Sequence, residues 1–267
     1  MTFTGTFIGA GHTISNLTAN ADEMTDDEVY TEHNIPMEGY EIETCRPVFA
    51  IFMNNAGTIE DVCFKDCVVK NSNGTIVAMV CAVNDGEIKD VIIDGGEVIG
   101  GDIWLDFNCF VGGFAAMNGQ GTITNCICNL SKLQGNANKD LVRYFCGKTW
   151  GKLINCYATN DCANLKDNVG GSIQTYNDKG EKINDQGIVG GGSAPELSES
   201  TGYGFTYAAV EWGSTAADAD FSTCMVIDAA GLKNYTLYKD KYDTNVWSIK
   251  EDSSAVPTLI VRYNAAK

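Results

Sequence analysis

The chain has 267 residues, of which 35 are acidic and 18 are Lys or Arg, so its formal net charge is −17 at pH 7. Such a charge opposes binding to nucleic-acid phosphates and to anionic membranes, and it leaves divalent cations as candidate partners. Hydrophobic residues make up 44% of the chain, which favours a folded domain with a core over disorder.

The first 17 residues, MTFTGTFIGAGHTISNL, contain neither the basic region nor the cleavage site of a signal peptide. No run of 18 apolar residues occurs in the chain, so the sequence predicts no membrane insertion by this segment. Because the pattern at Met1 already looks like the inside of a repeat, we expect the chain to be part of a larger polypeptide or assembly.

An acidic insertion follows at residues 18–47, where nine acids occur and no Lys or Arg precedes Arg46. Hard cations such as calcium prefer several carboxylate oxygens. The candidate calcium ligands are Asp22, Asp26, Asp27 and Glu28. The spacing of an EF-hand loop is absent, so a solvated acidic loop is the alternative interpretation.

Four segments share one pattern, and this repeat is the main structural signal of the sequence. Each begins with glycine and has an apolar residue two positions later, Asp or Asn four positions later, and Val or Cys five positions later. The segments are GTIEDVCF (57–64), GEIKDVII (86–93), GTITNCIC (121–128) and GKLINCYA (151–158). They start 29, 35 and 30 residues apart, which is typical of solenoid coils and too short for separate domains.

An apolar run precedes each segment, so every unit offers two short strands joined by a turn. Stacking the units about 4.8 Å apart predicts two interior columns of side chains. The first column holds Ile59, Ile88, Ile123 and Leu153, and the second holds Val62, Val91, Cys126 and Cys156. A third column would cap the turns or, alternatively, bind a ligand; it contains Asp61, Asp90, Asn125 and Asn155.

Three stretches of the sequence carry a resemblance to known proteins. FTGTFIGAGHTISNL is similar to the entry coil of right-handed β-helix surface proteins, FVGGFAAMNGQGTITNCICN resembles the GLUG-type repeat, and NVWSIKEDSSAVPTLIV is similar to the segment that often closes such repeats. The resemblance covers about residues 1–165 and 221–262. It implies an all-β protein with a right-handed parallel β-helix, adhesin-like and extracellular or on the cell surface. The sequence departs from this pattern at Ile8, where Asp is usual, and in the 75–98 unit, which lacks the Gly-Gly pair.

The remaining segments complete the predicted domain organisation. Residues 1–204 are expected to form the β-helix, with a polar, glycine-rich insertion at about 165–204. Residues 205–267 are expected to form a cap at the C-terminal end, because a stack of coils must hide its last strand from other chains. Helical periodicity is nearly absent, and only the 20–30 and 227–240 stretches could hold short helices.

Few residues are suited to catalysis. His12 and His33 are the only histidines, and no nucleophilic triad, zinc-enzyme or phosphate-loop motif occurs. The eleven cysteines lack the common metal-binding spacings, which favours buried thiols over disulfides or a metal cluster. We predict no enzymatic activity and no catalytic residue. The alternative is a polysaccharide lyase or glycosidase of the same fold, because β-helices often present long carbohydrate grooves.

Aromatic residues in the predicted turns and insertions are the candidate binding residues, because Trp and Tyr rings stack on sugars. They are Trp104, Trp150, Tyr203, Tyr207 and Trp212; the same rings could instead cover the coil ends. The sequence therefore predicts a non-catalytic, structural or adhesin-like segment with no cofactor except a possible calcium ion. Its expected partners are surface glycans or a host or cell-surface protein, and a component of a phage fibre or spike is a further alternative.

Overall fold

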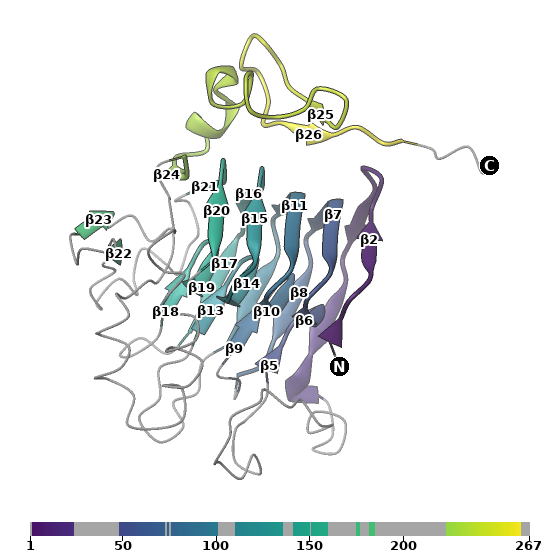
Figure 1. The fold of residues 1–267 in the computed structure, drawn as a ribbon, viewed down its shortest axis with the longest axis vertical. Helices are drawn as coiled ribbons and strands as arrows, with labels where there is room; N and C mark the ends of the chain where they lie inside the picture. Colours follow the sequence, from purple (N-terminus) through teal and green to yellow (C-terminus); the bar gives the residue numbers. More distant parts are fainter. Residues whose placement is uncertain are drawn as a thin grey trace.

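A computed structural model describes residues 2–23, 48–72, 74, 76–100, 110–135, 141–149, 151–159, 175–176, 182–184 and 223–262. Within these ranges the regular elements are β-strands and three short 3-10 helices, which confirms the all-β prediction. Most strands belong to four parallel sheets that enclose one interior (Figure 1). None of the helices in the described ranges is long and apolar enough to cross a membrane.

We name the four parallel sheets A to D in the order in which the chain visits them. Sheet A has the order β1 (Thr2–Phe3), β6 (Phe52–Asn55), β10 (Cys81–Asn84), β14 (Ala115–Asn118) and β19 (Cys146–Thr149). Sheet C has the order β17 (Lys132–Gln134), β12 (Glu97–Ile99), β8 (Val68–Lys70) and β4 (Thr18–Asn20). Sheet D has the order β18 (Leu141–Arg143), β13 (Phe110–Gly112), β9 (Ile76–Ala78) and β5 (Val48–Phe49).

Sheet B is the largest sheet and contains the repeated segments. Its strands are β2 (Thr6–Ile8), β3 (Thr13–Ser15), β7 (Thr58–Lys65), β11 (Glu87–Asp94), β15 (Thr122–Thr124), β16 (Ile127–Asn129), β20 (Lys152–Ile154), β21 (Tyr157–Thr159) and β24 (Met225–Ile227). Two antiparallel pairs lie outside the four sheets. They are β22 (Thr175–Tyr176) with β23 (Lys182–Asn184), and β25 (Trp247–Ser248) with β26 (Thr258–Leu259).

The chain passes through the sheets in the same order each time, and we call one such pass a coil. After β6 in sheet A it forms β7 in sheet B, β8 in sheet C and β9 in sheet D, and then returns to sheet A as β10. Strands that pair within a sheet therefore come from successive coils. Ile88 is in register with Ile59 on one side and with Ile123 on the other.

Both predicted interior columns are present. Ile59, Ile88, Ile123 and Leu153 are 0% exposed, and the pairs Ile88–Ile123 and Ile123–Leu153 are in register across neighbouring strands. The second column is buried to the same degree; it contains Val62, Val91, Cys126 and Cys156. Each buried aliphatic side chain contributes about 1.5–3 kcal/mol relative to an exposed one, so the columns are a main source of stability.

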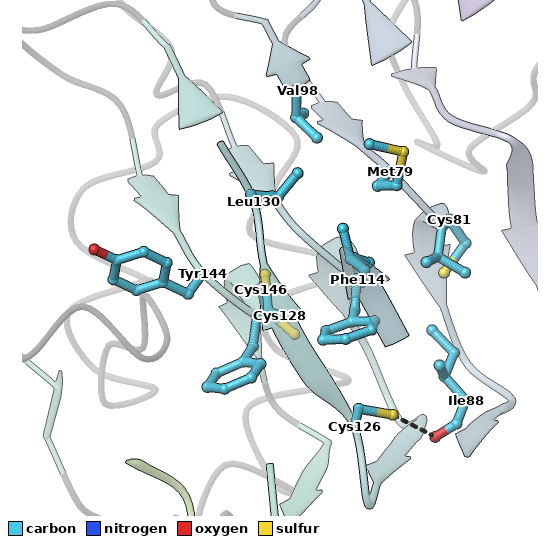
Figure 2. Close-up of a cluster of buried hydrophobic side chains, with 14 of the residues drawn as sticks. Met79, Cys81, Ile88, Val98, Phe114, Cys126, Cys128, Leu130, Tyr144 and Cys146 are labelled. Carbon is cyan, nitrogen blue, oxygen red and sulfur yellow. Dashed lines mark hydrogen bonds between the residues drawn. The ribbon is translucent and has the colours of Figure 1, made fainter. Parts of the chain in front are cut away.

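The interior between the sheets is filled by aromatic, aliphatic and sulfur-containing side chains (Figure 2). Phe114 and Phe145 stack across neighbouring coils, with ring centroids 6.0 Å apart. The eight cysteines in the described ranges are free thiols, and all except Cys63 are buried. The seven buried cysteines therefore pack in the interior as small apolar side chains.

A ladder of buried amides, which our sequence analysis missed, lies where sheet A turns into sheet B. Asn55 Nδ2 donates to Asn84 Oδ1 at 2.8 Å, Asn84 Nδ2 donates to Asn118 Oδ1 at 2.8 Å, and Asn118 Nδ2 donates to Thr149 Oγ1 at 2.9 Å. All four side chains are buried. The signal was available, because each of these residues lies two or three positions before the first glycine of a repeat.

The described part of the predicted C-terminal cap lies in two places. β24 pairs with β21 and so adds a last strand to sheet B at the end of the stack. We call residues 228–262 the C-terminal segment; it contains the 3-10 helices η4 (Gly231–Lys233) and η5 (Tyr235–Leu237). This segment runs back along the stack from β24 towards β2 (yellow-green in Figure 1). Its far end reaches the first coil, where Arg262 N donates to Ala10 O.

Candidate functional site

The third predicted column forms the bend between the two halves of sheet B, and we call it the bend column. Its members are Asp61, Asp90, Asn125 and Asn155, and all have φ between 52° and 61°. Asp and Asn are among the few non-glycine residues that visit this left-handed conformation readily. The backbone conformation thus explains why Asp or Asn recurs at this position of every repeat.

The first coil forms the same bend with more residues than the later coils. Ile8 pairs with Glu60 and Thr13 pairs with Cys63, so four residues of this coil face two residues of the next. Within this longer bend the positive φ angles belong to Ala10 (51°) and Gly11 (81°). Ile8 therefore departs from the repeat because it lies on the strand and not at the bend.

The bend column is linked from coil to coil by side-chain hydrogen bonds. Asn125 Nδ2 donates to Asp90 Oδ1 at 3.4 Å, and Asn155 Nδ2 donates to Asn125 Oδ1 at 3.2 Å. These bonds join the side chains of successive bends to one another.

The C-terminal segment covers the bend column and bonds to it at three coils. Trp247 Nε1 donates to Asp90 Oδ1 at 2.7 Å, and the guanidinium of Arg262 forms an ion pair with the carboxylate of Asp61. Tyr242 Oη donates to the carbonyl of Asn155 at 2.8 Å. The side chains of Asp61 and Asp90 are only 4% and 7% exposed. The column is therefore occupied by the protein's own chain, which supports a structural role for these residues.

Next to the bend column, the C-terminal segment packs on an apolar row of sheet B. The row includes Ile92, Ile127 and Tyr157, and the segment contributes Leu232, Tyr238, Tyr242 and Trp247 to the same buried cluster. The rings of Tyr242 and Trp247 have centroids 4.6 Å apart. Lys241 Nζ lies 2.8 Å from Tyr157 Oη. This face of sheet B is thus closed by the C-terminal segment.

Two rows of polar side chains remain exposed beside this covered face, and we call them the polar rows. In the first row Lys65 Nζ lies 3.3 Å from Asp94 Oδ2, and Asn129 Nδ2 donates to Asp94 Oδ1 at 3.0 Å. In the second row Lys132 Nζ lies 3.8 Å from Glu97 Oε2. The side chains of Lys65 and Asp94 are 52% and 41% exposed, and those of Lys132 and Glu97 are 31% and 43% exposed. Solvent therefore reaches both rows.

The polar rows were not among the sequence-based candidates. Lys65, Asp94 and Asn129 are in register on successive coils, and each directly follows one of the repeated segments. The residue that directly follows each repeated segment was therefore the sequence signal for the first polar row. Its charged and amide groups recur at the spacing of the coils, which suits a ligand with regularly spaced hydroxyl groups.

Of the four candidate calcium ligands, only Asp22 belongs to the described residues. Its carboxylate accepts hydrogen bonds from Ser72 N and Ser72 Oγ, both at 2.7 Å, and lies 2.9 Å from Lys70 Nζ. Burial alone would raise the pKa of Asp22, but the bonds from Ser72 and Lys70 outweigh it and lower the pKa. Asp22 thus uses both of its carboxylate oxygens to bind residues of the next coil. Asp26, Asp27 and Glu28 lie outside the described residues.

The five aromatic candidates also lie outside the described residues; they are Trp104, Trp150, Tyr203, Tyr207 and Trp212. In the described ranges no group of three or more His, Cys, Asp or Glu side chains is arranged to hold a metal ion. No family model, curated protein or solved structure matches the chain.

Proposed function

We propose that the four sheets form a right-handed parallel β-helix and that the chain is a non-catalytic, adhesin-like segment of an extracellular or cell-surface protein. The observation that carries this proposal is the in-register stacking of successive coils, with buried columns inside and polar rows outside. Connections that return to the same parallel sheet are right-handed in about 98% of cases, which supports the hand. A left-handed winding in an experimental structure would contradict it.

Glycan binding is the most specific role that we propose for this scaffold. Sugars are bound by side chains that donate and accept hydrogen bonds with their hydroxyl groups. The polar rows offer carboxylate, amide and ammonium groups side by side on neighbouring coils; they comprise Lys65, Asp94, Asn129, Glu97 and Lys132. A rigid stack fixes these groups before the ligand arrives, which reduces the entropic cost of binding.

A glycan array tests the proposal directly. The purified chain is screened with calcium and again with a chelator, and any sugar that is bound is then measured against Asp94→Ala. We expect saturable binding to one class of sugar, weakened at least tenfold by Asp94→Ala. Lys250→Ala is the matched control, because Lys250 is an exposed lysine of the C-terminal segment and does not belong to the polar rows.

The other outcomes of the screen separate the remaining functions. A blank array would leave a purely architectural segment, with recognition carried by another part of the parent protein. Shortened oligosaccharides after incubation would overturn the non-catalytic proposal in favour of a lyase or glycosidase. Calcium-dependent binding would direct the next variants to Asp26, Asp27 and Glu28.

A further inference from the structure

The second interior column ends in three cysteines on neighbouring strands. Ile127 pairs with Tyr157, and Tyr157 pairs with Met225. The residues that directly precede them are therefore opposite one another as well; they are Cys126, Cys156 and Cys224. The three side chains are 0%, 0% and 5% exposed. Both other thiols affect the pKa of Cys156, whose Sγ lies 3.4 Å from the carbonyl oxygen of Ile123 and 3.3 Å from that of Ile154.

This arrangement meets the distance requirement for a disulfide. Neighbouring strands lie about 4.8 Å apart, and the Cα atoms of a disulfide are usually about 4.4–6.8 Å apart. Because a cysteine sulfur forms only one disulfide bond, Cys156 can pair with Cys126 or with Cys224 but not with both.

The position of Cys224 favours it as the partner. It directly precedes β24, which is the last strand of sheet B, and Met225 in this strand is 42% exposed. An end strand opens more easily than a central one, because it is paired on one side only. Opening β24 would expose Cys224 and Cys156 together, whereas Cys126 stays covered by β21.

Chain connectivity adds a second reason. The preceding residues Asn155 and Thr223 are 68 positions apart, and Asn155 N donates to Thr223 Oγ1 at 2.9 Å. A bond between Cys156 and Cys224 would close this long loop, whereas Cys126 and Cys156 close one of about half that length. Closing a longer loop removes more conformational entropy from the unfolded chain.

We propose that Cys156 and Cys224 form a disulfide that fastens β24, and with it the C-terminal segment, to the last coil. The oxidant is a low-molecular-weight disulfide, RSSR. The thiolate of one cysteine attacks RSSR to give a mixed disulfide and one RS⁻, and the thiolate of the other cysteine then displaces a second RS⁻. The two protons of the cysteines pass to these leaving groups, so two RSH are released for each bond formed.

The burial of both thiols restricts when this reaction can take place. Burial raises the pKa of Cys156 well above its usual value, and the hydrogen bond with Cys156, together with burial, raises that of Cys224. Thiolates and not thiols attack disulfides, so the closed sheet protects both groups. The bond therefore forms during folding, or when β24 opens, and not in the closed stack.

Refolding the unfolded chain with glutathione disulfide, or with an excess of dithiothreitol, tests the proposal. Non-reducing peptide mapping by mass spectrometry is expected to join the peptides of Cys156 and Cys224 after refolding with glutathione disulfide only. The melting temperature of the oxidised chain should exceed that of the reduced chain by on the order of 10 °C. Cys224→Ala should abolish both effects, whereas Cys63→Ala, which removes a half-buried cysteine outside the column, should preserve them.

The peptide map of the wild-type chain tests the proposed bond between Cys156 and Cys224 even if a variant fails to fold. Free Cys156 and Cys224 after refolding with glutathione disulfide would overturn the proposal. A bond between Cys126 and Cys156 would overturn it as well, because the strand β24 would then remain unfastened.

Discussion

Asp90 contributes to the fold through both its backbone conformation and the hydrogen bonds of its side chain. Its backbone adopts a left-handed conformation with φ 53°, and its carboxylate accepts hydrogen bonds from Trp247 Nε1 and Asn125 Nδ2. The side chain is nearly buried. At the scale of single residues, the bend column therefore combines a backbone requirement with a contact to the C-terminal segment.

Replacing Asp90 separates these two contributions. Asp90→Ala should lower the free energy of unfolding by about 2–4 kcal/mol, because it leaves the buried Trp247 N–H without an acceptor and places Ala at a positive φ. Asp90→Asn keeps an acceptor and tolerates the backbone, so its cost should stay below about 1.5 kcal/mol. Urea unfolding measures both, and equal costs for the two variants would contradict this explanation.

The pKa shifts of two aspartates predict opposite effects of pH. Burial raises the pKa of Asp90, although its hydrogen bonds with Trp247 and Asn125 oppose this. Above the ordinary Asp value of about 4, the folded state then binds more protons than the unfolded state, so stability falls as pH rises. Asp22 has a lowered pKa, so its contribution is present above that ordinary value and is lost as pH falls through the lowered pKa.

Urea unfolding at several pH values checks this difference in sign. Relative to wild type, Asp90→Asn should become more stable as pH rises from about 4 towards 7. Asp22→Asn should become less stable relative to wild type as pH rises from below about 4, because the wild type then gains its ion pair with Lys70. The same direction of change in both variants would show that other groups govern the dependence on pH.

At the scale of elements, the C-terminal segment is a separate layer on sheet B. It has little regular structure of its own, apart from the β25–β26 pair and two short 3-10 helices. Its aromatic side chains pack on the outer face of β11, β16 and β21. A segment held mainly by such contacts is expected to open before the stack beneath it.

Trp247→Ala tests whether the segment opens as a unit. Trp247 is 1% exposed, and removing a buried Trp side chain costs about 3–5 kcal/mol. Hydrogen exchange measured by mass spectrometry should become at least tenfold faster in peptides from residues 228–262, while peptides from β11 keep their protection. Val261→Ala is the control, because this side chain is 45% exposed. Equal acceleration in β11 would show that the segment and the stack unfold together.

At the scale of the whole molecule, the excess of acidic residues destabilises the compact fold, whereas the packing of the stacked coils stabilises it. The formal net charge of −17 favours expansion through repulsion between like charges. The buried columns run through all coils and oppose that expansion. The ion pairs on the surface, such as Lys65–Asp94, offset only part of the repulsion.

Salt should therefore stabilise the protein at neutral pH. Raising NaCl from about 10 mM to about 500 mM shortens the screening length from about 30 Å to a few Å, so the melting temperature at pH 7 should rise by a few degrees. Lys233→Glu, at an exposed position, adds to the negative charge and should enlarge the rise. A melting temperature that falls with salt would mean that screening of the ion pairs outweighs screening of the repulsion.

The sequence alone determined the interior of the stack. The spacing of Ile59, Ile88 and Ile123 specified which side chains share a column, because residues on a strand alternate between its two faces. The positive φ of the bend column is likewise encoded locally, in the preference of Asp and Asn for that conformation. The amide ladder of Asn55 and Asn84 was equally readable, although we did not recognise it.

What covers sheet B depends on contacts between residues that are far apart in the sequence. Trp247 and Asp90 are 157 positions apart, and Arg262 and Asp61 are 201 positions apart. No repeat or periodic pattern connects such residues, because the C-terminal segment does not share the period of the coils. Its path depends on the outer face that the assembled coils present, and that face exists only once the strands of sheet B have been brought together.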